Sequence, residues 1–267
     1  KLTQSGTATF GGRSLTIGRL EQLYDRVGET NFTANLKGSL KIDGVSTSVT
    51  IADLRLNNGS ITPNEDKEVL IATSLAILAD DSSPFEVNAR SGKTFTITSS
   101  AATGSGLIKK TGYGALDMSG VTKNDSLLRV DMSVANANSI LKAPTKGVSL
   151  TSFAGGKVVV RYSGSFKKIG TVHVEEGADV VWPMAVEVNI ANLPIGEHLL
   201  MEDPVSVKPD FSVSDVSLTL TGSPVEGQIA AAPLKVVADG QMRKAYVVCE
   251  RLVDPEDVGD SPVLMIE

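Results

Sequence analysis

The segment Gly106-Leu-Ile-Lys-Lys-Thr-Gly-Tyr-Gly-Ala-Leu-Asp-Met-Ser-Gly120 decides the fold of this chain. Two short apolar runs, Leu107-Ile108 and Leu116-Asp117-Met118, flank the turn Gly112-Tyr113-Gly114. A unit this short buries very little apolar surface alone, so it becomes stable only where it stacks on a similar neighbour. The segment therefore predicts one coil of a stacked β structure.

The composition favours thin β layers over a compact sandwich core. Hydrophobic residues make up 41% and charged residues 21% of the 267 residues, which is typical of a globular chain. Aromatic residues reach only 4%, whereas a compact core usually fills its volume with large rings. The 25 glycines and the many Ser and Thr residues suit many short strands and turns.

Short β-branched runs recur along the chain, separated by Gly, Asn, Asp or Ser. The runs cover residues 14–17, 39–42, 48–51, 54–56, 68–71, 85–87, 94–97, 127–130, 157–160, 172–174, 205–207, 216–220, 234–237 and 245–248. Brief strands with frequent corners predict an all-β solenoid, while fewer and longer strands joined by hairpins would indicate an antiparallel β-sandwich. We expect the solenoid and keep the sandwich as the alternative.

One segment has helical periodicity. Leu20, Leu23, Tyr24 and Val27 recur at a spacing of three or four, with polar or charged residues between them. This pattern predicts one short amphipathic helix over about residues 19–28. We expect it to cover an end or a flank of the β stack, and a partner-docking helix is the alternative.

The last part of the chain has a different character. From about residue 193 the predicted strands become longer and alternate more clearly. Such strands are typical of a terminal cap that covers the exposed edge of a stack. We therefore expect β-helix coils over residues 1–192 and a C-terminal β cap, continuous with them, over residues 193–267.

The segment Gly104–Gly120 resembles the passenger-associated repeat of bacterial autotransporters, which reads approximately Gly-Gly-Leu-x-Lys-x-Gly-x-Gly-x-Leu-x-Leu-Ser-Gly. The matching positions are Ile108, Lys110, Gly112, Gly114, Leu116 and Met118, and the departures are Leu107 in a Gly position and Met118 for Leu. Residues 193–200 and 53–61 are more loosely similar to strands of such passengers. The resemblance implies a right-handed parallel β-helix that is exported to the bacterial cell surface or beyond.

The acidic pairs are the first candidates for chemistry, because some parallel β-helices carry polysaccharide-cleaving carboxylates on one face. The candidates are Asp80-Asp81, Glu175-Glu176, Glu202-Asp203 and the cluster Asp254, Glu256, Asp257 and Asp260. Adjacent carboxylates on a strand point to opposite faces, so they cannot act together on one sugar unless the backbone turns. The turn at Asp80-Asp81 could escape that restriction; we expect a solvated turn there, and calcium binding or catalysis is the alternative.

The remaining polar and aromatic residues suggest no metal or cofactor. His173 and His198 have no second ligand at metal-binding spacing. The single cysteine, Cys249, lies in an apolar run that predicts a buried, inert thiol. Trp182 also lies in an apolar run and is expected to pack, while Tyr113 lies near a turn, as Tyr162 does, where an exposed ring could stack on a sugar.

Charge and hydropathy exclude two classes of partner. The net charge is −6 and no long basic cluster is present, which argues against nucleic acid. No apolar run reaches the length of a membrane span. The chain lacks an initiator Met, so we expect a processed product or a piece of a longer protein.

These observations predict an extracellular structural or adhesive surface protein that presents a stiff β-solenoid and is not an enzyme. The sequence assigns no catalytic, metal or cofactor-binding residue and leaves the binding residues undetermined. The decisive segment itself, with Lys109 and Lys110, offers no evident chemistry. Other copies of the chain, other surface proteins and glycans are the candidate partners. A polysaccharide lyase or hydrolase and a glycan-binding spike remain as alternatives.

Overall fold

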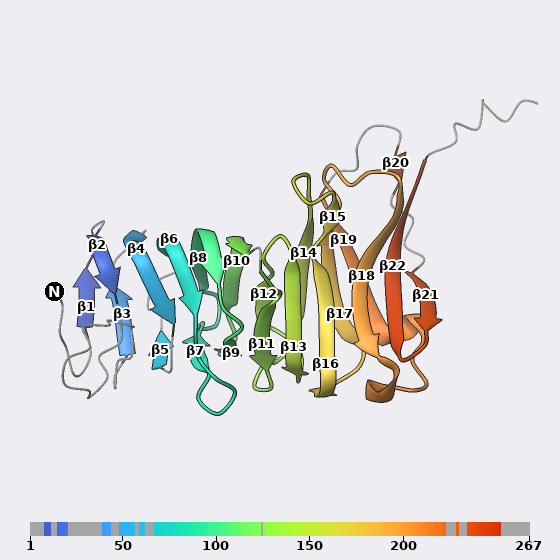
Figure 1. Ribbon diagram of the computed structural model, residues 1–267, viewed down its shortest axis with the longest axis horizontal. Helices are drawn as coiled ribbons and strands as arrows, with labels where there is room; N and C mark the ends of the chain where they lie inside the picture. The colour runs from blue at the N-terminus through green and yellow to red at the C-terminus, as the bar shows by residue number, and fades with distance from the viewer. Residues whose placement is uncertain are drawn as a thin grey trace, which may run out of the picture.

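The computed structural model describes residues 8–11, 15–20, 39–43, 48–56, 59–61, 67–123, 125–222, 228–229 and 234–251. These residues form a parallel β-helix, whose coils stack side by side along the long axis of the molecule (Figure 1). The expected solenoid is therefore confirmed. Each coil contributes one strand to each of two long sheets, which we call sheet A and sheet B.

Sheet A has twelve strands, of which β21 (Leu234–Asp239) pairs with β22 to one side of the main path. The path itself runs β1 (Ala8–Gly11), β3 (Ser39–Asp43), β5 (Gly59–Ile61), β7 (Phe85–Asn88), β9 (Leu107–Thr111), β11 (Leu128–Met132), β13 (Gly147–Phe153), β16 (Thr171–Val180), β18 (Gly196–Pro204), β22 (Met242–Arg251) and β20 (Gln228–Ile229).

Sheet B has ten strands, of which β15 (Lys168–Ile169) pairs antiparallel with β14 outside the main path. The path runs β19 (Val216–Thr221), β17 (Met184–Asn189), β14 (Lys157–Ser163), β12 (Ile140–Lys142), β10 (Ala115–Lys123), β8 (Thr94–Thr103), β6 (Lys67–Ile77), β4 (Ser48–Leu56) and β2 (Leu15–Leu20). Along this path neighbouring strands are parallel and come from successive coils.

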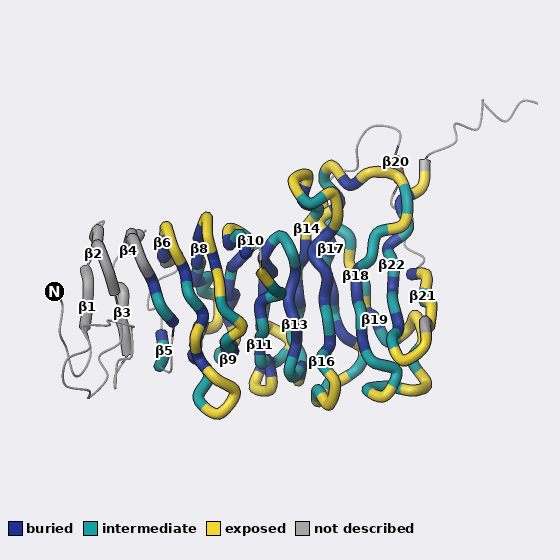
Figure 2. Tube along the Cα trace, in the orientation of Figure 1, coloured by how far each residue is buried: buried dark blue, intermediate teal, exposed yellow. Residues whose placement is uncertain are grey.

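The core is a stack of inward-facing columns between the two sheets. In sheet B, Phe95 pairs in register with Leu116, Leu116 with Leu141, and Leu141 with Val158, and all four side chains are fully buried. Alternate residues of each strand face this interior, as the strand period of two requires, so buried and less buried segments alternate along the chain (Figure 2). Each layer holds only a few aliphatic side chains, which explains the low aromatic content.

Antiparallel strands close sheet A after β18. β22 pairs antiparallel with β18, and β20 and β21 pair antiparallel with β22. The expected cap over residues 193–267 contains these strands, but it also contains β18 and β19, which continue the parallel coils. The predicted strand over residues 205–207 is wrong: Val205–Val207 form a 3-10 helix, η1. A three-residue apolar alternation bounded by prolines is too short to distinguish the two.

Some predictions fall on residues that the structure does not describe. The amphipathic helix expected over about residues 19–28 lies outside the described residues beyond Leu20, which is the last residue of β2. The acidic cluster at residues 254–260 also lies outside them. Among the described residues, no helix has the length and apolarity that crossing a membrane requires.

Candidate functional site

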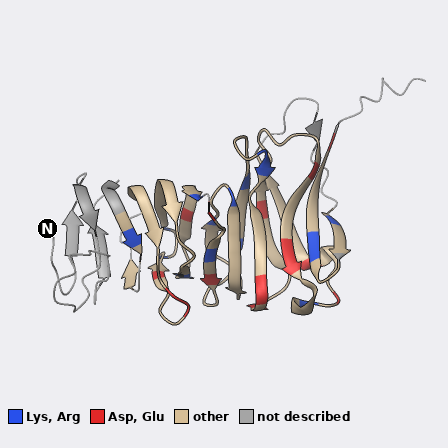
Figure 3. Ribbon diagram, in the orientation of Figure 1, with Lys and Arg blue, Asp and Glu red and all other residues tan. Residues whose placement is uncertain are grey.

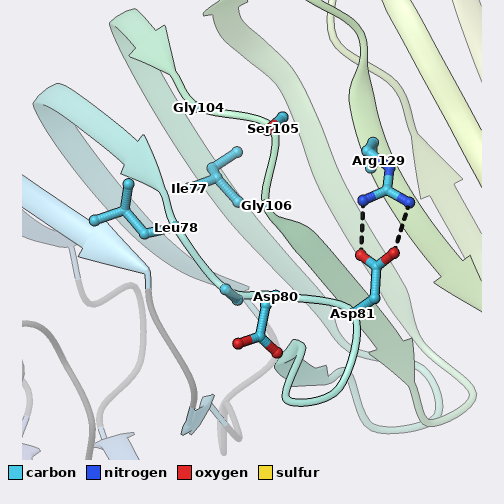
Figure 4. A pocket seen from close by; sticks show the side chains of 9 residues that line it. Ile77, Leu78, Asp80, Asp81, Gly104, Ser105, Gly106 and Arg129 are labelled. Atoms are coloured by element: carbon cyan, nitrogen blue, oxygen red, sulfur yellow. Dashed lines mark hydrogen bonds and ion pairs between the residues drawn. The ribbon is translucent and has the colours of Figure 1, made fainter.

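The most developed polar site lies on the outer face of sheet A, around Arg129 of β11. The guanidinium donates to both carboxylate oxygens of Asp81, at 2.7 and 3.1 Å, and to both of Glu175, at 2.7 and 2.9 Å. Figure 4 shows the bidentate contact with Asp81, while the Asp80 carboxylate points away from Arg129. Two carboxylates distant in sequence are therefore held by one side chain.

A tight turn places Asp81 at this site. The Asp80 carboxylate accepts hydrogen bonds from the Ser82 hydroxyl at 2.7 Å and from the Ser83 backbone N–H at 2.8 Å, which fixes the turn before β7. The Asp80 carboxylate therefore forms hydrogen bonds within the turn, and the neighbouring Asp81 carboxylate contacts Arg129. The prediction of a turn at Asp80-Asp81 is confirmed.

A bulge in β16 places Glu175. Leu150 pairs in register with Val174 and Ser152 with Asp179, so the four residues between Val174 and Asp179 project from the sheet opposite a single residue of β13. Such a bulge re-aims side chains. Glu175 turns back over Ser149, whose hydroxyl donates to it at 2.9 Å, and reaches Arg129.

Asp131 is a third acidic residue at this site. We call the site the Arg129 cleft and define it by Asp81, Arg129, Asp131, Ser152, Glu175 and Glu176. Its volume is about 360 Å³. Asp131 accepts hydrogen bonds from the Ser152 hydroxyl and the backbone N–H of Ser133, and its oxygen lies 3.9 Å from Lys109 Nζ. Charges of both signs therefore meet around β11, which itself carries Arg129 and Asp131, with Lys109 on β9 and Glu175 on β16 (Figure 3).

The electrostatics of the cleft favour ionised carboxylates. Hydrogen bonds from Arg129 lower the pKa of Asp81 and that of Glu175. Burial alone would raise the pKa of Asp131, but the hydrogen bonds from Ser152 and Ser133 outweigh it, and the net pKa is lowered. The carboxylates of Asp81 and Glu175 in turn raise the pKa of the Arg129 guanidinium. The lowered pKa values of Asp81, Asp131 and Glu175 all favour the ionised carboxylate.

The pair Glu202-Asp203 of β18 forms ion pairs with the antiparallel strand β22 of the cap. Asp203 is buried and forms an ion pair with Arg243 of β22, while Glu202 lies 3.8 Å from Lys244 on the same strand. The Arg243 guanidinium also lies 4.2 Å from the centre of the Phe211 ring. These contacts attach the segment after β18 to the antiparallel strands.

Cys249 and Trp182 are packed as the sequence predicts. Cys249 is buried in β22, and burial raises the pKa of its thiol. Trp182 packs edge-to-face on Phe211, with ring centres 5.4 Å apart. His198 lies in β18, where its Nε2 contacts the Pro194 carbonyl oxygen at 2.7 Å. Within the described ranges, no three His, Cys, Asp or Glu side chains are grouped as metal ligands.

Sequence reasoning missed the buried amine of Lys110. Its side chain is fully buried at the end of β9, and its Nζ donates to the Ser139 hydroxyl at 2.7 Å and to the Gly112 carbonyl oxygen at 3.1 Å. Burial lowers the pKa of Lys110 to about 8. The available signal was positional: Lys110 alternates in phase with Ile108, which faces the interior.

Comparisons of this chain with protein-family models, with curated protein sequences and with solved structures gave no match.

Proposed function

We propose that this chain is an extracellular structural or adhesive protein, not an enzyme, that presents a stiff β-solenoid at the outer surface of a bacterium. The observation that carries the proposal is the use of Arg129 as a brace. It binds Asp81, 48 residues earlier, and Glu175, 46 residues later, and so ties β11 to a turn two coils before it and a bulge two coils after it. The bacterial surface location rests on the resemblance to autotransporter passengers.

Ion pairs that cross coils on sheet B support the same reading. Lys142 Nζ lies 3.0 Å from the Asp117 carboxylate on the preceding coil, and Lys157 pairs with Glu187 on the following coil. Each such pair is worth little alone at the surface. Repeated along a stack whose stability depends on the contacts between neighbours, they oppose sliding and splaying of the coils.

A polysaccharide lyase or hydrolase is the second candidate, because the Arg129 cleft gathers several carboxylates on one face. A glycosidase needs one carboxyl group with a raised pKa that can give a proton to the leaving oxygen. The pKa values of Asp81, Asp131 and Glu175 are all shifted downward. This electrostatic state favours bracing and binding over hydrolysis. A glycan-binding spike is distinguished from both by trimerisation.

The test is an activity survey with matched variants. The purified chain is incubated with acidic and mucin-type polysaccharides, and new reducing ends and unsaturated products are measured. We expect no product from the wild type, and we expect Glu175→Gln to lower stability. Asp179→Asn is the control, because Asp179 is exposed on the same strand and does not line the cleft. Product formation that is lost in Glu175→Gln and kept in Asp179→Asn would replace the structural function with the enzymatic one.

A further inference from the structure

A second site lies at the corners where strands of sheet A pass to sheet B. Tyr113 is 52% exposed and is the only aromatic residue in the exposed class among the described residues. Gly112 has φ +75°, and a Cβ there would lie 2.2 Å from the Ala89 carbonyl oxygen. A Cβ on Gly114 would lie 1.9 Å from the Arg90 carbonyl oxygen. Two glycines that admit no side chain therefore hold the Tyr113 backbone tightly against the preceding coil.

The same corner is fixed from the interior. Lys110 Nζ and the Ser139 hydroxyl both donate to the Gly112 carbonyl oxygen, at 3.1 and 2.7 Å, and Lys110 Nζ also donates to Ser139 Oγ. Ser139 belongs to the corresponding corner of the next coil, and the Ile140 N–H donates to the Gly114 carbonyl oxygen at 3.2 Å. The backbone that carries Tyr113 is cross-linked to the next corner. The backbone under the ring is therefore already ordered before a ligand binds, and only the Tyr113 side-chain torsions remain to be fixed.

An open groove of about 630 Å³ lies beside the Tyr113 ring. The half-buried Ile140 lines it together with small residues from successive coils, namely Gly92, Ala137, Gly156 and Ala185. Neighbouring strands are about 4.8 Å apart, so the groove follows the stack over several such steps. The apolar part of its lining is therefore formed by Ile140, Tyr113 and these small residues.

Polar residues also line the groove. Ser91 and Asn138 are exposed at its edge, and the backbone N–H of Asn138 is held by Asn136 Oδ1 at 3.0 Å. Lys157 lines the groove and pairs with Glu187, whose other carboxylate oxygen accepts from the Thr221 hydroxyl. The site thus offers a hydroxyl, an amide and a paired ammonium, all suited to bonding hydroxyl groups.

We propose that this groove binds a glycan, with the Tyr113 ring stacked on the C–H face of one pyranose unit and Asn138 and Lys157 hydrogen-bonded to its hydroxyl groups. The inference rests on the proposed adhesive function and names its ligand class. One aromatic face with a few directional polar groups is the composition expected of a small-ligand site. A nucleic acid would need several cations, and this groove contributes one lysine, already paired with a carboxylate.

The experiment starts with a glycan array probed with the full chain, followed by titration calorimetry with maltotriose, chitotriose and sialyllactose. We expect saturable binding to at least one array glycan. Tyr113→Ala is expected to weaken it about tenfold, the loss typical of one aromatic contact, and Asn138→Ala is expected to weaken it measurably. Tyr113→Phe retains the ring face and is expected to bind as the wild type does. Val181→Ala, which truncates another exposed apolar side chain between β16 and β17, is the control.

Circular dichroism separates binding defects from unfolding, and Tyr113 is exposed enough that its truncation leaves the core intact. The proposal is overturned if no array glycan binds the folded wild type, or if Tyr113→Ala binds as well as Val181→Ala does. Either of these results would leave the proposed structural function intact, as long as the activity survey detects no cleavage of a polysaccharide. Cleavage lost in Glu175→Gln would refute the non-enzymatic function without affecting binding at Tyr113.

Discussion

Replacing Lys110 by Met is expected to remove a pH-dependent part of the stability of this protein. The side chain occupies the last interior position of β9, in register with the buried Val87 of β7. Among the described residues no carboxylate pairs with its ammonium group, which is bonded only to a hydroxyl and to backbone carbonyl oxygens. Burial therefore lowers the pKa of Lys110 from 10.5 to about 8.

The sign of the effect follows from proton counting. Below about pH 8 the amine is protonated in both the folded and the unfolded chain, and the fold carries the full cost of a buried charge. Between about pH 8 and pH 10.5 the unfolded chain binds more protons, so the free energy of unfolding rises with pH. At about 1.4 kcal/mol for each pH unit between these values, the rise totals about 3 kcal/mol.

The substitution has two opposing effects at neutral pH. Met removes the buried charge, and with it the cost of about 3 kcal/mol. It also leaves the Gly112 carbonyl oxygen and the Ser139 hydroxyl without the amine, which costs about 1–3 kcal/mol. We therefore expect nearly unchanged stability at neutral pH, with Lys110→Met becoming progressively less stable than the wild type in alkaline solution.

Urea unfolding of both proteins from about pH 7 to about pH 11 measures this difference. The wild-type value minus the Lys110→Met value is expected to grow by about 3 kcal/mol across that range, and titrations common to both proteins cancel. Lys109→Met is the matched control, because Lys109 lies on the outer face and is 32% exposed. A difference for Lys110→Met that stays constant with pH would refute the assignment of a buried, uncompensated charge.

Three further substitutions test the other supports of the fold. Arg129→Ala is expected to cost about 1 kcal/mol at pH 7. It should also reduce the loss of stability in acid, because Asp81 and Glu175 then lack the hydrogen bonds that lower their pKa values; urea midpoints at about pH 7 and about pH 3 measure both effects. Gly114→Ala is expected to cost more than about 2 kcal/mol, whereas Gly164→Ala, whose added Cβ would have no neighbour within 4 Å, is expected to be silent in thermal unfolding. Arg243→Met is expected to cost about 3–5 kcal/mol in urea unfolding by leaving buried Asp203 unpaired, and an additional Asp203→Leu is expected to recover most of that loss.

The solenoid could be predicted because its determinants are local. The Gly112-Tyr113-Gly114 corner and the short apolar runs beside it repeat a pattern that a stack requires, and the structure places them accordingly. The Arg129 cleft could not be predicted in the same way. Arg129 contacts Asp81 and Glu175, which lie 48 and 46 residues away from it, and these contacts depend on the register of successive coils. The periodicity of apolar residues along the sequence carries no information on the register between coils.

The rule that adjacent carboxylates point to opposite faces was right for a regular strand and insufficient for Glu175-Glu176. The bulge in β16 interrupts the pleat at that point, and Glu175 is re-aimed along the sheet toward Arg129. The bulge is hard to predict from the sequence, because Gly177 is the only residue in it that is typical of an interrupted strand. The turn at Asp80-Asp81 is predictable from the sequence. The different roles of the two residues are not, because they depend on Ser82 and Ser83, which donate hydrogen bonds to Asp80 and leave Asp81 to contact Arg129.

The segment 106–120 also positions two side chains, Lys110 and Tyr113, besides forming one coil of the solenoid. Strand alternation sends Lys110 inward, and the corner that follows sends Tyr113 outward, so the two lie on opposite sides of one backbone. The amine beneath the corner bonds the carbonyl oxygen of Gly112, the residue that precedes Tyr113. The buried amine therefore helps to fix the backbone that carries the exposed ring. If Lys110→Met keeps its neutral stability and yet weakens glycan binding at Tyr113, this bond between the amine and the corner contributes to the binding site.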